Sequence, residues 1–455
     1  MLQSVLSALQ LPDLRRRIVF TLGMLLLFRL IAHIPVPNID PAALAQLREA
    51  LQTNQLAQLL NIFAGGALQN LSVAAMGVYP YITAQIIMQL LQPIIPALDE
   101  MRKEGDQGRM KFNRIVFYAT VPMAFLQAYG QTLTLERSLG AGASLFLTPF
   151  DIVNNFLPTF TVLIVLVAGS MVLVWMGEQI QTYGIGNGVS MIIFAGIVSG
   201  LPSLIIQAFE SINLGGLENV LGVLLFLVIG LGTLLGIVLM HEGQRRIPVQ
   251  YAKRMRGNRV YGGQSSHIPL KVNMAGMIPL IFAQSIIIFP GTIASYACPT
   301  QVASAGAGWL EQFACFIYAT FSPSVQGNVQ TVGGLIYALL LFVLVYFFTY
   351  FYTKVIFDQQ NIPDSLQKNG GFVPGFRPGK QTETYLNAVV SRITRVGALF
   401  LGGIAVLPFI TQVITGFPIG LGATALLIVV GVAVDTLRQI EAQMVMRNYE
   451  GFIKR

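Results

Sequence analysis

Ten apolar stretches, each long enough to cross a membrane, constrain the fold of this chain more than any other feature. A transmembrane helix needs about 20 predominantly apolar residues, and backbone that faces lipid must satisfy its own hydrogen bonds. Only 11% of the residues are charged, whereas soluble proteins have about 25%. The sequence therefore predicts an all-α integral membrane protein with ten transmembrane helices. The predicted spans are residues 18–35, 74–95, 113–131, 155–176, 187–206, 217–240, 272–292, 332–357, 391–412 and 418–440.

The distribution of positive charge predicts how these spans are oriented. If the N-terminus is cytoplasmic and the spans alternate, 25 of the 28 Lys and Arg residues fall on the cytoplasmic side. The exceptions are Arg29, inside the first span, and Arg48 and Arg137, in outer loops. This is the positive-inside pattern in a strong form. We therefore expect a multi-pass protein whose N- and C-termini are both cytoplasmic.

Two cytoplasmic loops, residues 241–271 and 358–390, are longer than the connection requires. The first carries seven basic residues but a single carboxylate, Glu242. Such charges can be solvated topology signals, but their number favours a docking surface for an anionic partner. The apolar residues among them indicate ordered structure, and VQYA beside RVYG predicts a short hairpin.

The segment NIFAGGALQNLSV, residues 61–73, does not fit the series of spans. It is too short and too polar to cross the membrane, and Gly65-Gly66 interrupts it. Irregular backbone at membrane depth is tolerated only inside protein or along a water-filled cavity. Two interpretations stay open: a surface loop, or a short helix in the outer mouth of a cavity.

Motifs of enzymes and ion-coupled carriers are absent from the sequence. It has no Walker loop, no HExxH pattern, no cluster of metal ligands and no carboxylate at mid-depth of a span. We expect no catalytic residue, no metal and no cofactor. We interpret Arg29 as a residue that makes a structural contact or whose side chain snorkels toward the membrane surface. The pattern GIGNG at 184–188 predicts a flexible entry and a close-packed helix start with Asn187 as its cap.

Two rival functions belong to other classes of protein. Two sets of five spans would have opposite orientation, which permits the inverted repeat of a secondary transporter. An intramembrane hydrolase would need paired acids or a Ser/His set at one depth. The two cysteines, Cys298 and Cys315, share one outer loop, so a disulfide and two free thiols both remain possible.

Six long stretches, in order along nearly the whole chain, resemble the SecY family of protein-translocation channels. They are PYITAQIIMQLLQP (80–93), YGIGNGVSMIIFAGIVSGLP (183–202), GQRRIPVQYAKR (243–254), IPLKVNMAGMIPLIFAQSIIIFP (268–290), GFVPGFRPGKQTETYL (371–386) and IEAQMVMRNYEGF (440–452). The resemblance implies an hourglass of two pseudo-symmetric inverted five-helix halves. Residues 1–211 would hold spans one to five, and residues 212–455 would hold spans six to ten. Segment 61–73 would be the plug, with Phe63, Gly65, Gly66, Leu68 and Asn70 as its site residues.

The resemblance also assigns a pore ring and a lateral gate. The ring would be aliphatic, because a narrow apolar neck blocks ions by dewetting yet accommodates many side chains. Its residues would be Ile82, Ile86, Val189, Ile193, Ile281 and Ile428. Spans two and seven would form the gate, with Thr83, Gln85 and Asn273 as the polar part of its seam.

The expected function is a protein-conducting channel that translocates unfolded secretory proteins and releases transmembrane segments sideways into the lipid. The expected partners are the small membrane subunits SecE and SecG, the SecA motor, ribosomal RNA phosphates, nascent or unfolded polypeptide with a signal sequence, and membrane lipid, but no DNA. The membrane would be a bacterial plasma membrane or a thylakoid. Contacts to the ribosome and the motor would come from Arg245, Arg246, Lys253, Arg254, Arg256, Arg259, Arg377 and Lys380.

Overall fold

A computed structural model describes most of the chain as helices with two small antiparallel sheets. It describes residues 11–53, 61, 64–92, 94–138, 144–151, 154–214, 217–251, 254–256, 259–261, 265–298, 308–321, 332–415 and 423–453. The chain forms two compact units. The first unit comprises residues 1–223, 285–337 and 416–455, and the second comprises residues 224–284 and 338–415.

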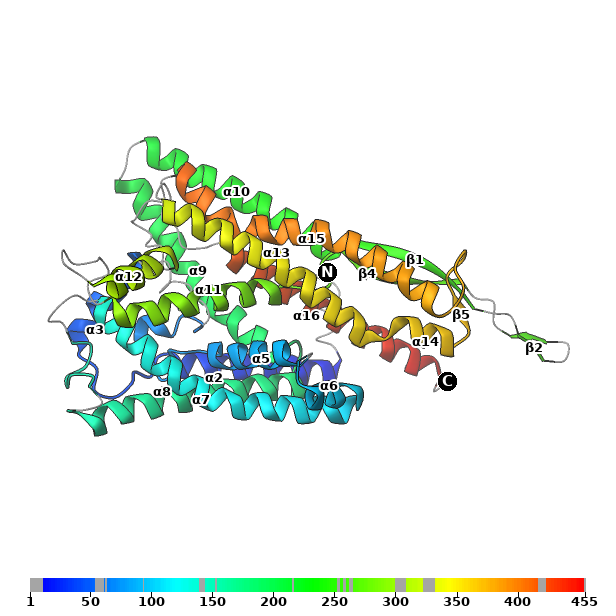
Figure 1. The fold of residues 1–455 in the computed structure, drawn as a ribbon, viewed down its shortest axis with the longest axis horizontal. Coiled ribbons are helices and arrows are strands. Elements are labelled where there is room, and N and C mark those ends of the chain that lie inside the picture. The colour runs from blue at the N-terminus through cyan, green and yellow to red at the C-terminus, as the bar shows by residue number, and fades with distance from the viewer. Residues whose placement is uncertain are drawn as a thin grey trace. The chain divides into compact units, whose positions relative to one another are not determined.

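Apart from two isolated β-bridges, the regular structure in the described part of the first unit is helical, and it includes parts of three helices that continue into the second unit. Its helices are α2 (Pro12–Ile31), α3 (Pro41–Thr53), the 3-10 helix η1 (Leu68–Asn70), α5 (Tyr79–Leu91), α6 (Pro96–Lys103), α7 (Asp106–Ser138), α8 (Phe156–Tyr183), α9 (Gly188–Leu214), α12 (Trp309–Phe321) and α16 (Ala423–Ile453). Helix α9 packs against α2, α8 and α16, and α5 packs against α7. Figure 1 shows α3 and α12 at one end of this unit and α6 at the opposite end. That arrangement agrees with the orientation predicted from the charges, which assigns α3 and α12 to the outer side.

The second unit combines long helices with the larger sheet. Its elements are the greater part of α10 (Leu217–Glu242), β1 (Gln244–Tyr251), β2 (Arg254–Arg256), β3 (Arg259–Tyr261), β4 (Ser265–Lys271), the start of α11 (Ile278–Ala297), most of α13 (Val332–Gln360), α14 (Ile362–Lys368), β5 (Gly371–Phe372) and α15 (Lys380–Thr415). The larger sheet has the strand order β4-β1-β5, all antiparallel, with Ile247 opposite Ile268 and Tyr251 opposite Gly371.

The two long loops, which the charge distribution assigns to the cytoplasmic side, fold together into one body within this unit. Strand β5 of the second loop pairs with β1 of the first. Inward residues Ile247 and Val249 of β1 share a buried cluster with Leu366 of α14 and Leu386 of α15. The predicted pairing of VQYA with RVYG is wrong. Val249 lies opposite Ser266 in the larger sheet, while RVY pairs with RMR in a separate two-stranded sheet, where Arg254 lies opposite Tyr261. Burial of the alternate residues Ile247 and Val249 fixes the register of β1, because a slip of one residue would expose both.

Each predicted span overlaps a helix, although several helix bounds differ from the prediction. Among the described residues, α8, α10, α13 and α15 contain segments long and apolar enough to cross a membrane, and α9 and α11 contain shorter apolar segments. Helix α2 ends at Ile31 rather than at residue 35, because Pro35 instead forms a β-bridge with Ser72. Helix α5 begins at Tyr79 rather than at residue 74, with Pro80 in its first turn, where proline is favoured.

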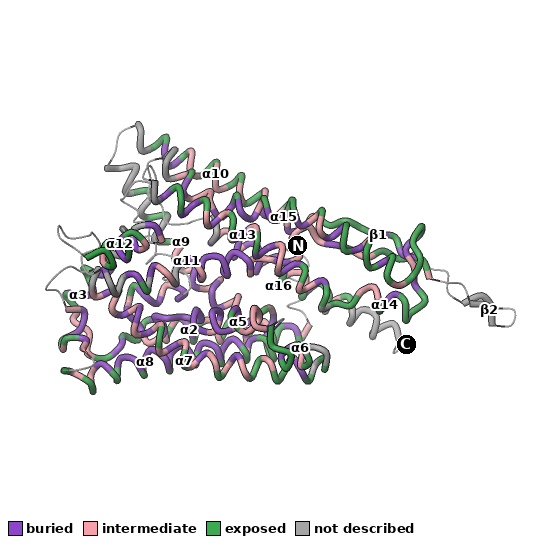
Figure 2. Tube along the Cα trace, in the orientation of Figure 1, coloured by how far each residue is buried: buried purple, intermediate pink, exposed green. Residues whose placement is uncertain are grey.

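The helices differ in how much of their surface is buried, as Figure 2 shows. Helix α10 exposes Leu227, Leu231, Leu235 and Leu239 along its length. Helix α8 instead buries Leu166, Leu173 and Ile180. Exposed leucines on an all-apolar helix are what a lipid environment requires.

The alternatives left open for the two cysteines are decided by the structure. Cys298, just after α11, is bonded to Cys315 in α12, and the Cα–Cα distance is 5.0 Å. Both half-cystines are buried in a small cluster with Ala294 and Tyr318. The bond therefore fastens α12 to the end of α11 within the first unit.

Candidate functional site

The predicted ring residues lie on helices that bury them. Ile82 and Ile86 are one turn apart on α5, so they share a face, and both are buried. Ile193 on α9 and Ile428 on α16 are also buried, on two helices that pack against each other. Val189 is half-buried. Ile281 is buried near the start of α11, in the second unit.

The start of α9 is held in place by a cap and by a close backbone approach. The side-chain oxygen Oδ1 of Asn187 accepts a hydrogen bond from the backbone N–H of Ser190 at 3.2 Å. A Cβ added at Gly188 would lie 1.8 Å from the carbonyl oxygen of Gly177 on α8. The predicted cap and the close packing at the start of the helix are confirmed. The cap and this contact fix the register at which Val189 and Ile193 are presented.

The segment 64–71 is buried within the first unit and is not a surface loop. Ala64, Ala67 and Leu68 are almost completely buried, and η1 covers only three residues. Gly65 has a φ of +66°, and a Cβ placed on it would lie 2.5 Å from Cζ of Phe28 on α2. A Cβ on Gly196 of α9 would lie 2.0 Å from the Cα of Gly65. The two glycines thus let the segment approach α2 and α9 at backbone distance, while the predicted site residue Phe63 lies outside the described residues.

Two arginines bind this segment. Arg29 makes a structural contact, one of its two expected roles, but the sequence did not reveal its partner or the role of Arg48. Nη1 of Arg29 donates to the carbonyl oxygen of Gly65 at 3.2 Å. Arg48 on α3 donates through Nε to the Gln69 carbonyl at 3.2 Å and through Nη2 to Oδ1 of Asn70 at 3.0 Å. Arg29 and Arg48 are two of the three exceptions to the positive-inside distribution. That departure was the signal available in the sequence.

The predicted gate residues differ in how their polar groups are satisfied. The hydroxyl of Thr83 donates to backbone carbonyls of its own helix, at 2.9 Å for Pro80, and accepts from Nε2 of Gln127 on α7 at 2.9 Å. Gln85 is half-buried. The side chain of Asn273 donates to the Gly276 carbonyl at 3.1 Å, but its buried Oδ1 accepts no hydrogen bond among the described residues. An unsatisfied buried amide oxygen leaves an acceptor for another group.

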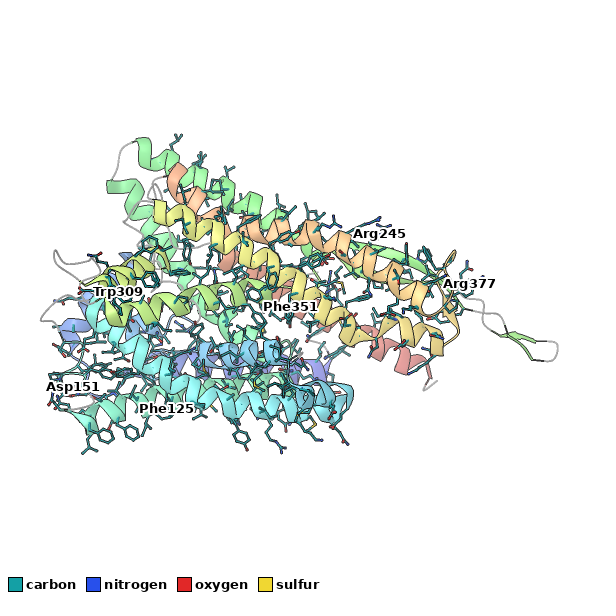
Figure 3. The ribbon with its side chains drawn as sticks, in the orientation of Figure 1. Phe125, Asp151, Arg245, Trp309, Phe351 and Arg377 are labelled. Carbon is teal, nitrogen blue, oxygen red and sulfur yellow. A yellow bond between two sulfur atoms is a disulfide. The ribbon has the colours of Figure 1, made fainter. Side chains whose placement is uncertain are left out.

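The predicted docking residues are exposed where their side chains are described. Arg245 and Arg246 on β1 are exposed, as are Arg377 and Lys380 at the turn between β5 and α15. Figure 3 shows Arg245 and Arg377 at the sheet end of the second unit. The backbone carbonyl of Arg377 accepts a hydrogen bond from the Thr382 hydroxyl at 2.8 Å. The side chains of Lys253, Arg254, Arg256 and Arg259 lie outside the described residues.

Comparison with known proteins identifies the family. The SecY family model matches residues 72–437. The chain is 41% identical to protein translocase subunit SecY of Thermotoga maritima, over 100% of the chain and 98% of that protein. It is 42% identical to protein translocase subunit SecY of Escherichia coli K12, over 98% of the chain and 95% of that protein.

Solved structures share the fold at lower sequence identity. A structure described as that of a protein conducting channel has a TM-score of 0.64 at 18% identity, with 95% of this chain and 93% of that chain covered. Sec61 in a canine ribosome-channel complex from the endoplasmic reticulum has a TM-score of 0.61 at 18% identity, with the same coverage. The full-length relatives, the family model and the shared fold agree, and the chain belongs to the SecY family of protein translocase subunits.

Proposed function

We propose that this chain is the central subunit of a protein-conducting channel, closed on its outer side by residues 61–73. The observation that carries the proposal is the seat of the Gly65-Gly66 segment, buried against α2 and α9 and bound by Arg29 and Arg48. A short segment with little regular structure can leave such a seat without unfolding the helices around it. Membership of the SecY family favours this function over a secondary transporter.

The waist of the channel is the aliphatic ring of Ile82, Ile86, Val189, Ile193, Ile281 and Ile428. An apolar neck does not hold a continuous water column, so it resists ions while a polypeptide passes. Spans two and seven form the lateral gate, and the free acceptor on Asn273 is suited to a polar seam. Interhelical hydrogen bonds in membranes contribute only about 0.6 kcal/mol on average, so such a seam opens at modest cost.

The energy for transport comes from partners, and the chain itself hydrolyses nothing. The basic sheet end of the second unit docks either ribosomal RNA phosphates or a SecA motor, and SecE and SecG accompany the chain in the membrane. The membrane is a bacterial plasma membrane or a thylakoid, with both termini cytoplasmic. The two halves, residues 1–211 and 212–455, form an inverted repeat.

The direct test of this function is transport in a defined membrane. The chain, reconstituted in vesicles with its small subunits and a motor, is expected to carry an unfolded precursor into the lumen, where added protease cannot reach it. Protection must depend on the signal sequence of the precursor. A channel that accumulates a small solute against its gradient, and protects no precursor, would restore the transporter alternative.

Loss of the arginine contacts to the plug is expected to open the resting channel. We expect Arg29→Gln to raise the resting open probability about tenfold or more, because a hydrogen bond from a charged group contributes about 1.5–3 kcal/mol. Arg48 is exposed, so Arg48→Gln should raise it at most about fivefold. Single-channel recording in planar bilayers measures both, and deletion of residues 63–71 gives the upper reference. Resting currents unchanged in Arg29→Gln, but raised by the deletion, would show that Arg29 does not hold the plug.

Charge reversal on the docking face is expected to weaken ribosome binding and flatten its dependence on salt. Each phosphate contact contributes about 0.7–0.9 to the slope of log K against log salt concentration. Arg245, Arg246 and Arg254 changed together to Glu should therefore reduce that slope by about two to three. The matched control reverses Arg109, Lys111 and Arg114, three basic residues of α7, by the same total charge. Equal loss of slope in both triple variants would assign the effect to net charge alone.

A further inference from the structure

Helix α12 carries an apolar surface that the proposed channel function does not use. Its inward side is buried against the end of α11 through the cluster of Cys298, Cys315 and Tyr318. Its other side exposes Leu310 and three aromatic side chains, with Trp309 78% exposed. The exposed aromatic residues are Trp309, Phe313 and Phe316.

The spacing of these residues places them on one helix face. Positions 309, 313 and 316 follow the i, i+4, i+7 pattern, so their side chains lie side by side along the helix. The helix holds a single charged residue, Glu311, and it is not among the exposed side chains. Exposed Gln312 lies on the same face, which otherwise consists of Trp, Leu and Phe and carries no cation. Such a mainly apolar face is a poor surface for water, and tryptophan is enriched at the boundary between lipid and water.

Three observations indicate what covers this face. Figure 3 shows Trp309 at the same end of the first unit as Asp151, which the charge distribution assigns to the outer side. The Cys298–Cys315 bond agrees with that side, since disulfides persist in oxidising compartments. Ile293, near the bonded end of α11, is also exposed, so the helix to which α12 is bonded, and which the sequence assigns to the membrane, presents an apolar side chain near its outer end.

We propose that α12 is an interfacial anchor whose Trp309–Phe313–Phe316 face is embedded in the outer leaflet at the level of the headgroups. The disulfide holds the helix against the end of α11, so the anchor ties the outer end of α11 to the membrane surface. The partner is the lipid interface itself rather than a second protein. The inference rests on the fold and the side-chain exposure and stands whether or not the pore ring is correctly assigned.

The chain offers a clean optical test, because it has only two tryptophans, Trp175 and Trp309. In Trp175→Phe, reconstituted as the full chain in vesicles of phosphatidylethanolamine and phosphatidylglycerol, Trp309 is the sole reporter. Lipids that carry a nitroxide near the headgroup are expected to reduce its emission at least about twofold. Lipids with a nitroxide deep in the acyl chain should quench it less, and aqueous iodide should quench it little.

A matched control reports from the bilayer interior. Leu231 is exposed in the middle of α10, so Leu231→Trp in a Trp175→Phe, Trp309→Phe background should show the reverse order of quenching by depth. Strong iodide quenching of Trp309 with none by lipid nitroxides would place α12 in water and overturn the proposal. Protection from both quenchers would mean that protein covers the face, which also overturns it. The resting conductance of these variants tests the channel function, whereas the quenching measurements test the anchor.

Discussion

Changing the aliphatic waist to serine is expected to make the channel conduct ions strongly while a polypeptide occupies it. Ile86, Ile193, Ile281 and Ile428, replaced together by Ser, would line the neck with hydroxyl groups that hydrogen-bond water. A wetted neck loses the dewetting barrier on which ion exclusion depends. Single-channel current, recorded with a translocating chain arrested in the pore, should rise severalfold over the unmodified channel. A smaller increase is expected at rest, because the plug still occupies its seat.

Two controls separate polarity at the waist from general disturbance of the helices. The same four positions changed to Leu nearly conserve volume and polarity, so the conductance should stay close to that of the unmodified channel. Ile86 is 3% exposed and its neighbour Ile87 is 42% exposed, so the single variants Ile86→Ser and Ile87→Ser form a matched pair on one helix. Only Ile86→Ser should raise the current.

Equal currents from the Ser and Leu rings would remove these residues from the waist. That comparison is meaningful only if both variants assemble. Size-exclusion elution of the purified channel and its thermal midpoint check assembly, since buried Ile→Ser changes can cost several kcal/mol.

Reversing the charge of Arg377 is expected to stop motor-driven transport while the channel stays assembled. The side chain is exposed, and the turn is held through its backbone carbonyl by Thr382 rather than through the guanidinium. Arg377→Glu should therefore leave the turn intact and remove one contact to the motor. An interface hot spot contributes about 2 kcal/mol or more, so the rate of precursor protection at subsaturating motor should fall at least about tenfold.

The matched control for Arg377 lies nearby in the same unit. Lys368, in the last turn of α14, is also exposed and carries the same charge. Lys368→Glu should transport precursor at nearly the normal rate, and both variants should keep ribosome binding. Normal motor-driven transport by Arg377→Glu would exclude the proposed role of Arg377.

Much of the helical framework follows from the sequence, because lipid leaves the backbone few alternatives. The ten apolar stretches overlap helices, and Asn187 caps α9 as its position in GIGNG suggests. Helix ends were less predictable. Residues 32–35 are not helical, because Pro35 forms a β-bridge with Ser72, which lies 37 positions later in the chain. Hydropathy reports local composition and carries no information about such a partner.

The parts of the site that sequence reasoning missed depend on contacts between distant segments. Arg48 donates to the backbone carbonyl of Gln69 and to the side-chain amide oxygen of Asn70. Every residue has a backbone carbonyl, so the sequence does not show which carbonyl accepts a hydrogen bond. The two basic loops pair through β1 and β5, although each loop alone suggests only ordered structure. The sequence left the state of the two cysteines undecided for the same reason. Two cysteines in one loop need not lie close together, whereas here their Cα atoms are 5.0 Å apart and the sulfurs are bonded.

The most direct test of the central claim is to find which residues an arrested polypeptide touches. The two native cysteines are bonded to each other, so a cysteine introduced at position 86, 193 or 428 is the only free thiol. A precursor with one cysteine in its arrested segment should form a disulfide with each of these positions and none with a cysteine at the exposed position 87. Cross-links at 87 as strong as those at 193 and 428, or none at the three ring positions, would show that the polypeptide does not pass through this waist.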